Sequence, residues 1–208
     1  VPDVDGPGGE LLFLRMGVAA GREALGGRVF EGRRLALVVG VSIDHENSTF
    51  HALVERLGDT LGATGPRIVV SVACASGIAA LGVARQLLED GAADAVLAGG
   101  VDALNEETFA GFDALGVLSP APCAPFSTPA GTTLGEGAAL FLLERAAPSG
   151  PSGVEGVHVW FRGGGLSADG YHPTSPHPRG DGVERAVRAA LGEAGLKPAD
   201  IGYVNAHG

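Results

Sequence analysis

Two thiols, Cys74 and Cys123, are the strongest nucleophiles that this sequence offers. Cys74 stands between a short apolar run and an apolar-periodic stretch, so a strand-to-helix junction is expected there. A thiol at a helix N-terminus lies near unpaired N–H groups and the positive end of the helix dipole, which favours the attacking thiolate. A backbone N–H at the same turn is a ready oxyanion donor. A buried structural cysteine among small apolar neighbours fits the local residues about equally well.

The remaining polar candidates are less specific. Cys123 lies in a loop with no evident base, which predicts a bystander thiol. His172 and His177 share a loop, but no cysteine or carboxylate at ligand spacing accompanies them, so we expect exposed histidines and no metal site. Two cysteines in a chain of 208 residues do not make a disulfide framework.

The elements expected to position Cys74 alternate between apolar runs and amphipathic stretches. Strands are predicted at 35–41, 68–72, 93–98 and 138–143, and helices at 9–25, 50–61 and from Cys74 to about 90. Strands that are apolar throughout are typical of parallel sheets covered on both faces. The sequence therefore predicts an α/β fold.

Residues 148–153, PSGPSG, are the best linker candidate. Beyond them we expect a strand at 154–161, a helix opened by Asp181 and ending near Gly195, and a last strand at 201–205. Glu184 has the capping-box spacing from Asp181. The predicted organisation is an N-terminal block 1–147, a linker 148–153 and an incomplete second block 154–208.

Composition and charge exclude several classes of protein. The formal charge is −10 and no Lys/Arg cluster exceeds Arg33-Arg34, which argues against nucleic acid as a partner. No apolar run approaches a membrane span and no signal peptide opens the sequence, so a cytoplasmic location is expected. Because Met16 is the only methionine, we expect a fragment of a longer chain.

An ordered set of motifs resembles the β-ketoacyl-ACP synthases (ketosynthases) of fatty-acid and polyketide assembly, within the thiolase superfamily. The motifs are VACASG around Cys74, LAGGV at 97–101, GEGA at 135–138, SADGYHPTSP at 167–176 and NAHG at 205–208. The fourth is close to the elongating, bacterial type II subgroup. The resemblance implies a thiolase-like fold with α-β-α-β-α layers, here the N-terminal half and the start of the C-terminal half.

The resemblance also implies roles for individual residues. Cys74 would accept an acyl group from the pantetheine thiol of acyl carrier protein, and His207 would stabilise the enolate formed when a malonyl thioester loses carbon dioxide. Thr174 resembles a position at the pantetheine entrance, although a turn-forming hydroxyl fits equally well. Phe112 is a candidate substrate contact, because the resemblance places its segment near the acyl channel, although a core position suits Phe109 and Phe112 better than a pocket. No cofactor is expected, because the carrier's phosphopantetheine brings the substrates.

Three interpretations of this resemblance stay open. The first is an acyltransferase, a 3-oxoacyl-ACP synthase whose second histidine, lysine and GFGG loop lie beyond Gly208, so that this chain alone lacks part of the catalytic set. The second is a non-catalytic partner like a chain-length factor, against which Cys74 argues and which the unusual segment 127–131 favours. The third is a thiolase, against which NAHG argues. The expected partners are acyl carrier protein and a homodimer or heterodimer mate, paired through the strand 68–72.

Overall fold

The computed structural model describes residues 8–42, 49–126, 128, 131–146, 159–172 and 175–207. The chain divides into two compact units, which we call unit 1, residues 1–146, and unit 2, residues 147–208. The predicted linker at 148–153 lies outside the described residues and stays a prediction. No helix in these described ranges is long and apolar enough to cross a membrane.

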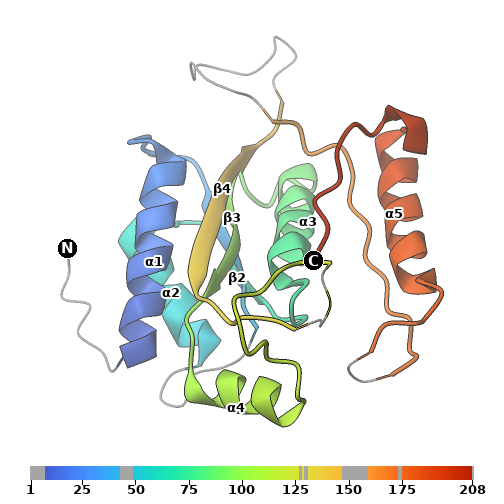
Figure 1. Cartoon of the computed structure of the whole chain (residues 1–208). Helices are drawn as coiled ribbons and strands as arrows, with labels where there is room; N and C mark the ends of the chain where they lie inside the picture. Colours follow the sequence, from blue (N-terminus) through green and yellow to red (C-terminus); the bar gives the residue numbers. More distant parts are fainter. Residues whose placement is uncertain are drawn as a thin grey trace. The chain divides into compact units, whose positions relative to one another are not determined.

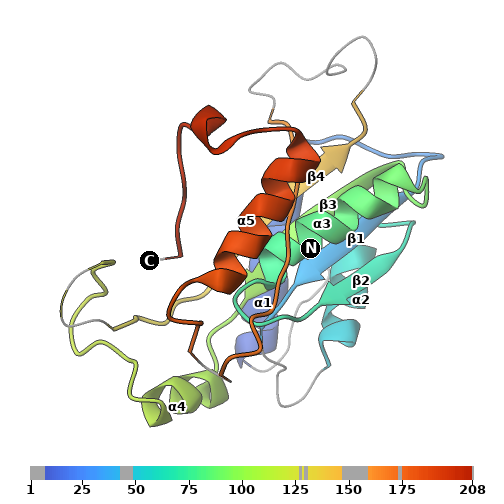
Figure 2. The same ribbon diagram turned by 90° about the vertical axis from the view of Figure 1, so that its right-hand side faces the viewer.

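Unit 1 is built on a four-stranded sheet of order β2-β1-β3-β4 (Figures 1 and 2). Its strands are β1 (Leu35–Gly40), β2 (Arg67–Val70), β3 (Ala95–Asp102) and β4 (Gly137–Glu144). β1 pairs in parallel with β2 and with β3, while β4 runs antiparallel to β3. The predicted largely parallel sheet is therefore confirmed for three strands, and the carboxyl ends of those three meet at one end of the sheet.

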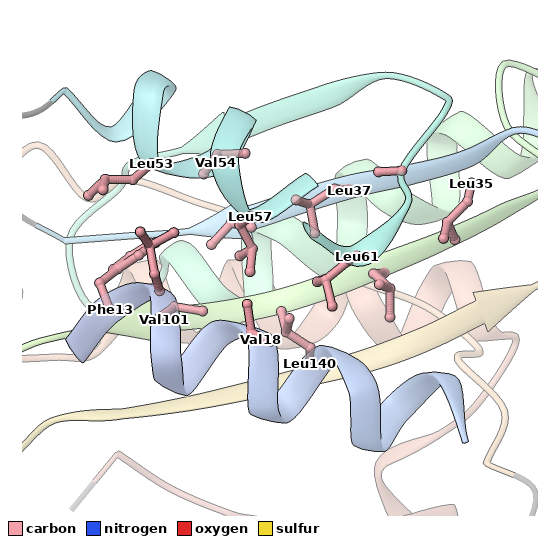
Figure 3. Packing of buried hydrophobic residues seen from close by; sticks show 14 of the residues in the cluster. Phe13, Val18, Leu35, Leu37, Leu53, Val54, Leu57, Leu61, Val101 and Leu140 are labelled. Carbon is pink, nitrogen blue, oxygen red and sulfur yellow. The ribbon is translucent and has the colours of Figure 1, made fainter. Parts of the chain in front are cut away.

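Helices cover both faces of this sheet (Figures 1 and 2). α1 (Gly8–Leu25) and α2 (Phe50–Leu61) lie on one face, and α3 (Ser76–Glu89) lies on the other. Alternate side chains of a strand point to opposite faces. Leu37 and Val39 of β1 accordingly pack with α1 and α2 in one apolar cluster, part of which is drawn in Figure 3, whereas Val38 packs with α3 in a second. All six residues of β1 are buried, as its uninterrupted apolar sequence predicts.

A helix that the sequence analysis did not predict, α4 (Glu106–Ala114), follows β3. Its sequence has little apolar periodicity, which is the signal that the prediction relied on, and none of its residues is buried. Local contacts form it instead, because the Asn105 side chain accepts a hydrogen bond from the Thr108 N–H at 2.7 Å and acidic residues occupy the first turn. Phe109 on this helix is 52% exposed, so its interpretation as a core residue is wrong.

Unit 2 contains α5 (Asp181–Ala194) and a short 3-10 turn, Pro198–Asp200. α5 ends at Gly195 in a left-handed conformation, as expected, but the predicted capping box at Asp181 is wrong: Asp181 is the first helical residue, and the N-cap is Gly180. The predicted strand at 201–205 is also wrong, because within the described residues this apolar segment has no neighbouring strand to pair with. Residues 159–161 form no strand either, and the rest of the strand predicted at 154–161 lies outside the described residues.

Candidate active site around Cys74

Cys74 stands in a sharp turn between β2 and α3, at the carboxyl end of the parallel strands. The turn depends on Ala73, whose φ of 52° lies in the left-handed region that few non-glycine residues adopt. The Cys74 side chain is exposed and the thiol is free. The predicted strand-to-helix junction is confirmed, and the alternative of a buried structural cysteine is wrong.

A hydroxyl that the sequence analysis missed braces this turn. Ser76 Oγ accepts a hydrogen bond from the Val72 N–H at 2.8 Å and donates one to the Ala73 carbonyl at 2.6 Å. Ser76 is buried, with 3% of the residue's surface exposed. The available signal was a hydroxyl residue two positions after the cysteine, at the predicted helix start.

Glycine lets the first turn of α3 lie directly against the sheet. A Cβ on Gly40, the last residue of β1, would overlap the backbone of Ser76 and Gly77. On the same side, a Cβ on Gly77 would come to 3.7 Å from the Gly100 Cα of β3, an ordinary contact distance. The absence of a side chain at Gly40 therefore sets how close the helix and Cys74 come to the strand ends.

A second polar network joins the carboxyl ends of the three parallel strands. Asp102, which ends β3, accepts hydrogen bonds from both the Ser42 N–H and the Ser42 hydroxyl, each at 3.0 Å. The Ser71 hydroxyl donates to the Ser42 carbonyl at 3.5 Å. The loop after β1 is thus tied to the end of β3 and to the segment that leads into Cys74. Sequence reasoning missed Asp102 and Ser42, because no local pattern shows that residues 60 positions apart meet.

The start of α3 carries no side-chain cap. Ala75 is the N-cap residue and makes no side-chain hydrogen bond, unlike Thr49 of α2 and Asn105 of α4. The first N–H groups of a helix have no partner within the helix. The Ser76 N–H donates to the Ala73 carbonyl. Beside the exposed thiol, N–H groups of this turn that no side chain caps can donate hydrogen bonds to a carbonyl oxygen on which negative charge develops under attack.

The other predicted site residues lie elsewhere. Phe112 is a partly buried residue of α4, and His207 is an exposed residue of unit 2. Thr174 lies outside the described residues. Cys123 is an exposed thiol in its own loop, where its Sγ donates to the Gly131 carbonyl at 3.4 Å. The structure thus describes Cys74 and Phe112 within unit 1 and His207 within unit 2.

An open cavity of about 680 Å³ lies beside α4. It is lined by Leu104, Asn105, Glu106, Phe109, Ala110 and Glu136. Phe109 rather than the predicted Phe112 is the aromatic residue in this lining. Within the described part of the chain, no group of three or more His, Cys, Asp or Glu side chains is placed to hold a metal ion.

Solved structures of ketosynthases share this architecture. The chain superposes on a β-ketoacyl synthase from Burkholderia phymatum STM815 with a TM-score of 0.79 and 28% identity, over 95% of this chain and 57% of that one. It superposes on a ketosynthase in complex with its chain length factor from Xenorhabdus doucetiae with a TM-score of 0.72 and 31% identity, over 88% and 50% of the two chains. The fold is therefore the mixed α/β, thiolase-like fold of the ketosynthases. Unit 1 supplies helix, sheet and helix layers, and the described residues of unit 2 hold no strand.

Sequence comparison agrees with the structural one. Residues 42–149 match the family described as Beta-ketoacyl synthase, N-terminal domain, and residues 159–208 match the Beta-ketoacyl synthase, C-terminal domain. The chain belongs to the β-ketoacyl synthase family. It is 37% identical over 155 residues to 3-oxoacyl-[acyl-carrier-protein] synthase 2 of Staphylococcus aureus, a match that covers 71% of this chain and 38% of that protein. The chain thus spans well under half of this curated relative.

Proposed function

We propose that the chain acts as a 3-oxoacyl-ACP synthase, an acyltransferase that condenses an acyl thioester with malonyl-ACP, with Cys74 as the nucleophile. The observation that carries the proposal is the exposed Cys74 thiol at an uncapped helix start, in a turn braced by Ser76. Membership of the β-ketoacyl synthase family and the 37% identity to a 3-oxoacyl-ACP synthase support it.

The proposed reaction begins with acyl transfer to Cys74. The thiolate attacks the carbonyl carbon of acyl-ACP, a C–S bond forms to Cys74, and the pantetheine thiolate leaves and takes up a proton. The tetrahedral oxyanion lies where uncapped N–H groups of α3 can donate to it. The product of this half-reaction is an acyl thioester on Cys74.

Condensation then consumes malonyl-ACP. The malonyl group loses carbon dioxide, and the electron pair of the broken C–C bond is held as an enolate. His207 donates a hydrogen bond to the enolate oxygen, a role that suits a neutral imidazole. The enolate carbon attacks the acyl carbon, a C–C bond forms, and Cys74 leaves as thiolate. Thr174 and Phe112 are proposed to contact the pantetheine and the acyl chain, and the chain itself needs no bound cofactor.

We also propose acyl carrier protein and a related subunit as partners. Among the strands that the structure describes, β2 lies at the edge of the sheet and pairs with β1 alone, and all four of its residues are half-buried. An unpaired strand edge presents N–H and C=O groups that a second chain can bind. The Xenorhabdus ketosynthase forms a complex with its chain length factor, which favours a heterodimer here, and a homodimer is the alternative. A cytoplasmic location stays a prediction from the sequence.

Acylation of Cys74 tests this function. The chain is incubated with acyl-ACP and the acyl group is located by peptide mass mapping. We expect one acyl group on Cys74, none on the Cys74→Ala variant, and undiminished labelling of Cys74 in the matched Cys123→Ala variant. Acylation of neither cysteine, or of Cys123 alone, contradicts the proposal.

A second measurement distinguishes the proposed condensing enzyme from the alternative, a non-catalytic subunit like a chain-length factor. Release of carbon dioxide from malonyl-ACP is followed with the chain alone and with a ketosynthase partner added. A condensing subunit loses its carbon dioxide release on His207→Ala substitution, because the enolate then lacks its hydrogen-bond donor, and it loses acyl transfer on Cys74→Ala substitution. A chain-length-factor-like subunit supports release by its partner whether or not Cys74 is present.

A further inference from the structure

The hydroxyl of Ser76 makes two hydrogen bonds to the backbone of the Cys74 turn. We propose that Ser76 is a positioning residue for Cys74: its hydroxyl holds Ala73 in the left-handed conformation and so determines where the thiol stands. The inference rests on the proposed function only in taking Cys74 as the nucleophile. The geometry that supports it belongs to unit 1 alone.

The two hydrogen bonds of this hydroxyl span the unusual residue. Oγ accepts from the N–H of Val72, the residue before Ala73, and donates to the carbonyl of Ala73 itself. A serine at a helix start ordinarily directs its hydroxyl to the N–H groups of its own helix. Here the hydroxyl points back along the chain, so it fixes the turn and leaves the helix start uncapped.

Alanine is not the residue that this backbone conformation favours. Glycine adopts a positive φ at no steric cost, whereas the Cβ of an alanine crowds the following carbonyl oxygen. A left-handed alanine therefore persists only where its surroundings hold it. The Ser76 hydroxyl supplies two such contacts, and the Ser76 N–H adds a third by donating to the Ala73 carbonyl at 3.0 Å.

Loss of the hydroxyl acts directly on the reactive group. Without it, Val72 loses its acceptor and Ala73 can relax toward a negative φ, which rotates the peptide that leads into Cys74. The thiol then leaves the position beside the first turn of α3 that favours its attack on a carbonyl or an alkylating agent.

Thr64 provides a matched control within the same unit. Its hydroxyl also bridges two backbone groups, accepting from the Leu35 N–H at 3.3 Å and donating to the Arg33 carbonyl at 3.1 Å. Leu35 begins β1, so this bridge lies at the amino ends of the parallel strands, whereas Cys74 follows their carboxyl ends. Thr64→Ala therefore removes an equivalent pair of bonds far from the thiol.

Competition between the two thiols of the chain tests the proposal. The full chain, Ser76→Ala and Thr64→Ala are treated with limiting iodoacetamide, and the ratio of alkylated Cys74 to alkylated Cys123 is measured by mass mapping. We expect a ratio that falls about two- to tenfold in Ser76→Ala, the factor that one hydrogen bond's net contribution corresponds to. Thr64→Ala should keep the ratio of the unchanged chain, because Thr64 lies far from Cys74. Alkylation of Cys123 in the same sample corrects for differences in reagent concentration and reaction time.

An unchanged ratio in folded Ser76→Ala overturns the proposal, as does an equal fall in both variants. If Ser76→Ala does not fold, hydrogen exchange of the unchanged chain decides. The Val72 amide should be protected although Val72 as a residue is 51% exposed, and exchange at the rate of an unstructured peptide overturns the proposal. If the ratio falls in Ser76→Ala but acyl-ACP does not acylate the chain, the proposed condensing function is contradicted, whereas the positioning role of Ser76 is supported.

Discussion

The two units place their apolar side chains differently. α2 of unit 1 and α5 of unit 2 both carry apolar residues at helical spacing. On α2 four of these residues are buried, including Leu57, which is fully enclosed by the first apolar cluster. On α5, Val183 and Val187 are 65% and 51% exposed, and Gly182 is its buried residue among those described. Helical periodicity in a sequence thus shows that a helix has an apolar face. That face becomes buried only where another element of the structure covers it.

The largest effect that separates the units is expected from core truncation. Leu57→Ala removes a side chain with 0% exposure and should cost about 2–5 kcal/mol in the free energy of unfolding. The matched change Val187→Ala on α5 should stay within about 0.5 kcal/mol. Urea unfolding followed by circular dichroism reports the whole chain, while fluorescence of Trp160, the single tryptophan, reports unit 2. A Val187→Ala cost equal to that of Leu57→Ala would show that α5 is covered.

A smaller effect is expected at the contact between helix and sheet. Gly40→Ala places a Cβ against the backbone of Ser76 and Gly77, which has no flexible end to move away, and should cost about 1–3 kcal/mol. Gly77→Ala meets Gly100 only at ordinary contact distance and removes a glycine from a helix, so its effect should be neutral or favourable by up to about 1 kcal/mol. Thermal unfolding of both variants measures the difference. Equal destabilisation would contradict the close approach at Gly40.

Much of unit 1 was predictable from sequence, because its elements have strong local signals. The helix predicted at 50–61 matches α2, which has a threonine cap at one end and a left-handed glycine at the other. The position of Cys74 between strand and helix was predictable for the same reason. Three features were missed. The start of α4 depends on one side chain, the Asn105 cap. The direction of β4 and the contact of Asp102 with Ser42 depend on partners that are distant in sequence. The prediction of a strand at 201–205 was wrong, because an apolar segment forms a strand only where a neighbouring strand pairs with its backbone groups.

The smallest expected difference between the two units lies in how the stability of each depends on pH. Asp94 of unit 1 accepts hydrogen bonds from the side chain and then the backbone N–H of Arg34, which lowers its pKa to about 2. Because this pKa lies below its ordinary value, the stabilisation is present above about pH 4 and is lost as the pH falls toward 2. Asp94→Asn should therefore show a shallower acid loss of circular dichroism over that range, and an unaltered profile would contradict the assignment.

Asp169 provides the counterpart in unit 2. Its pKa is lowered by hydrogen bonds from the backbone N–H groups of His177 and then Tyr171. The same sign applies, so its contribution is lost as the pH falls below the ordinary range of a carboxyl group. Asp169→Asn should alter the acid response of Trp160 fluorescence, whereas Asp94→Asn should leave that response in place. Movement of both signals by either variant would mean that the two units unfold together.

The antiparallel direction of β4 determines where unit 1 can be labelled safely. β4 begins opposite Asp102, at the end of the sheet where Cys74 stands, and finishes at Glu144 opposite Ala95. Eight residues at about 3.4 Å each carry the chain on the order of 25 Å away from that end. Glu144 is held there by ion pairs with Arg28 and Arg33. A fluorophore or surface tether attached at exposed Arg145 would therefore sit on a rigid anchor, beyond the reach of chemistry at the thiol.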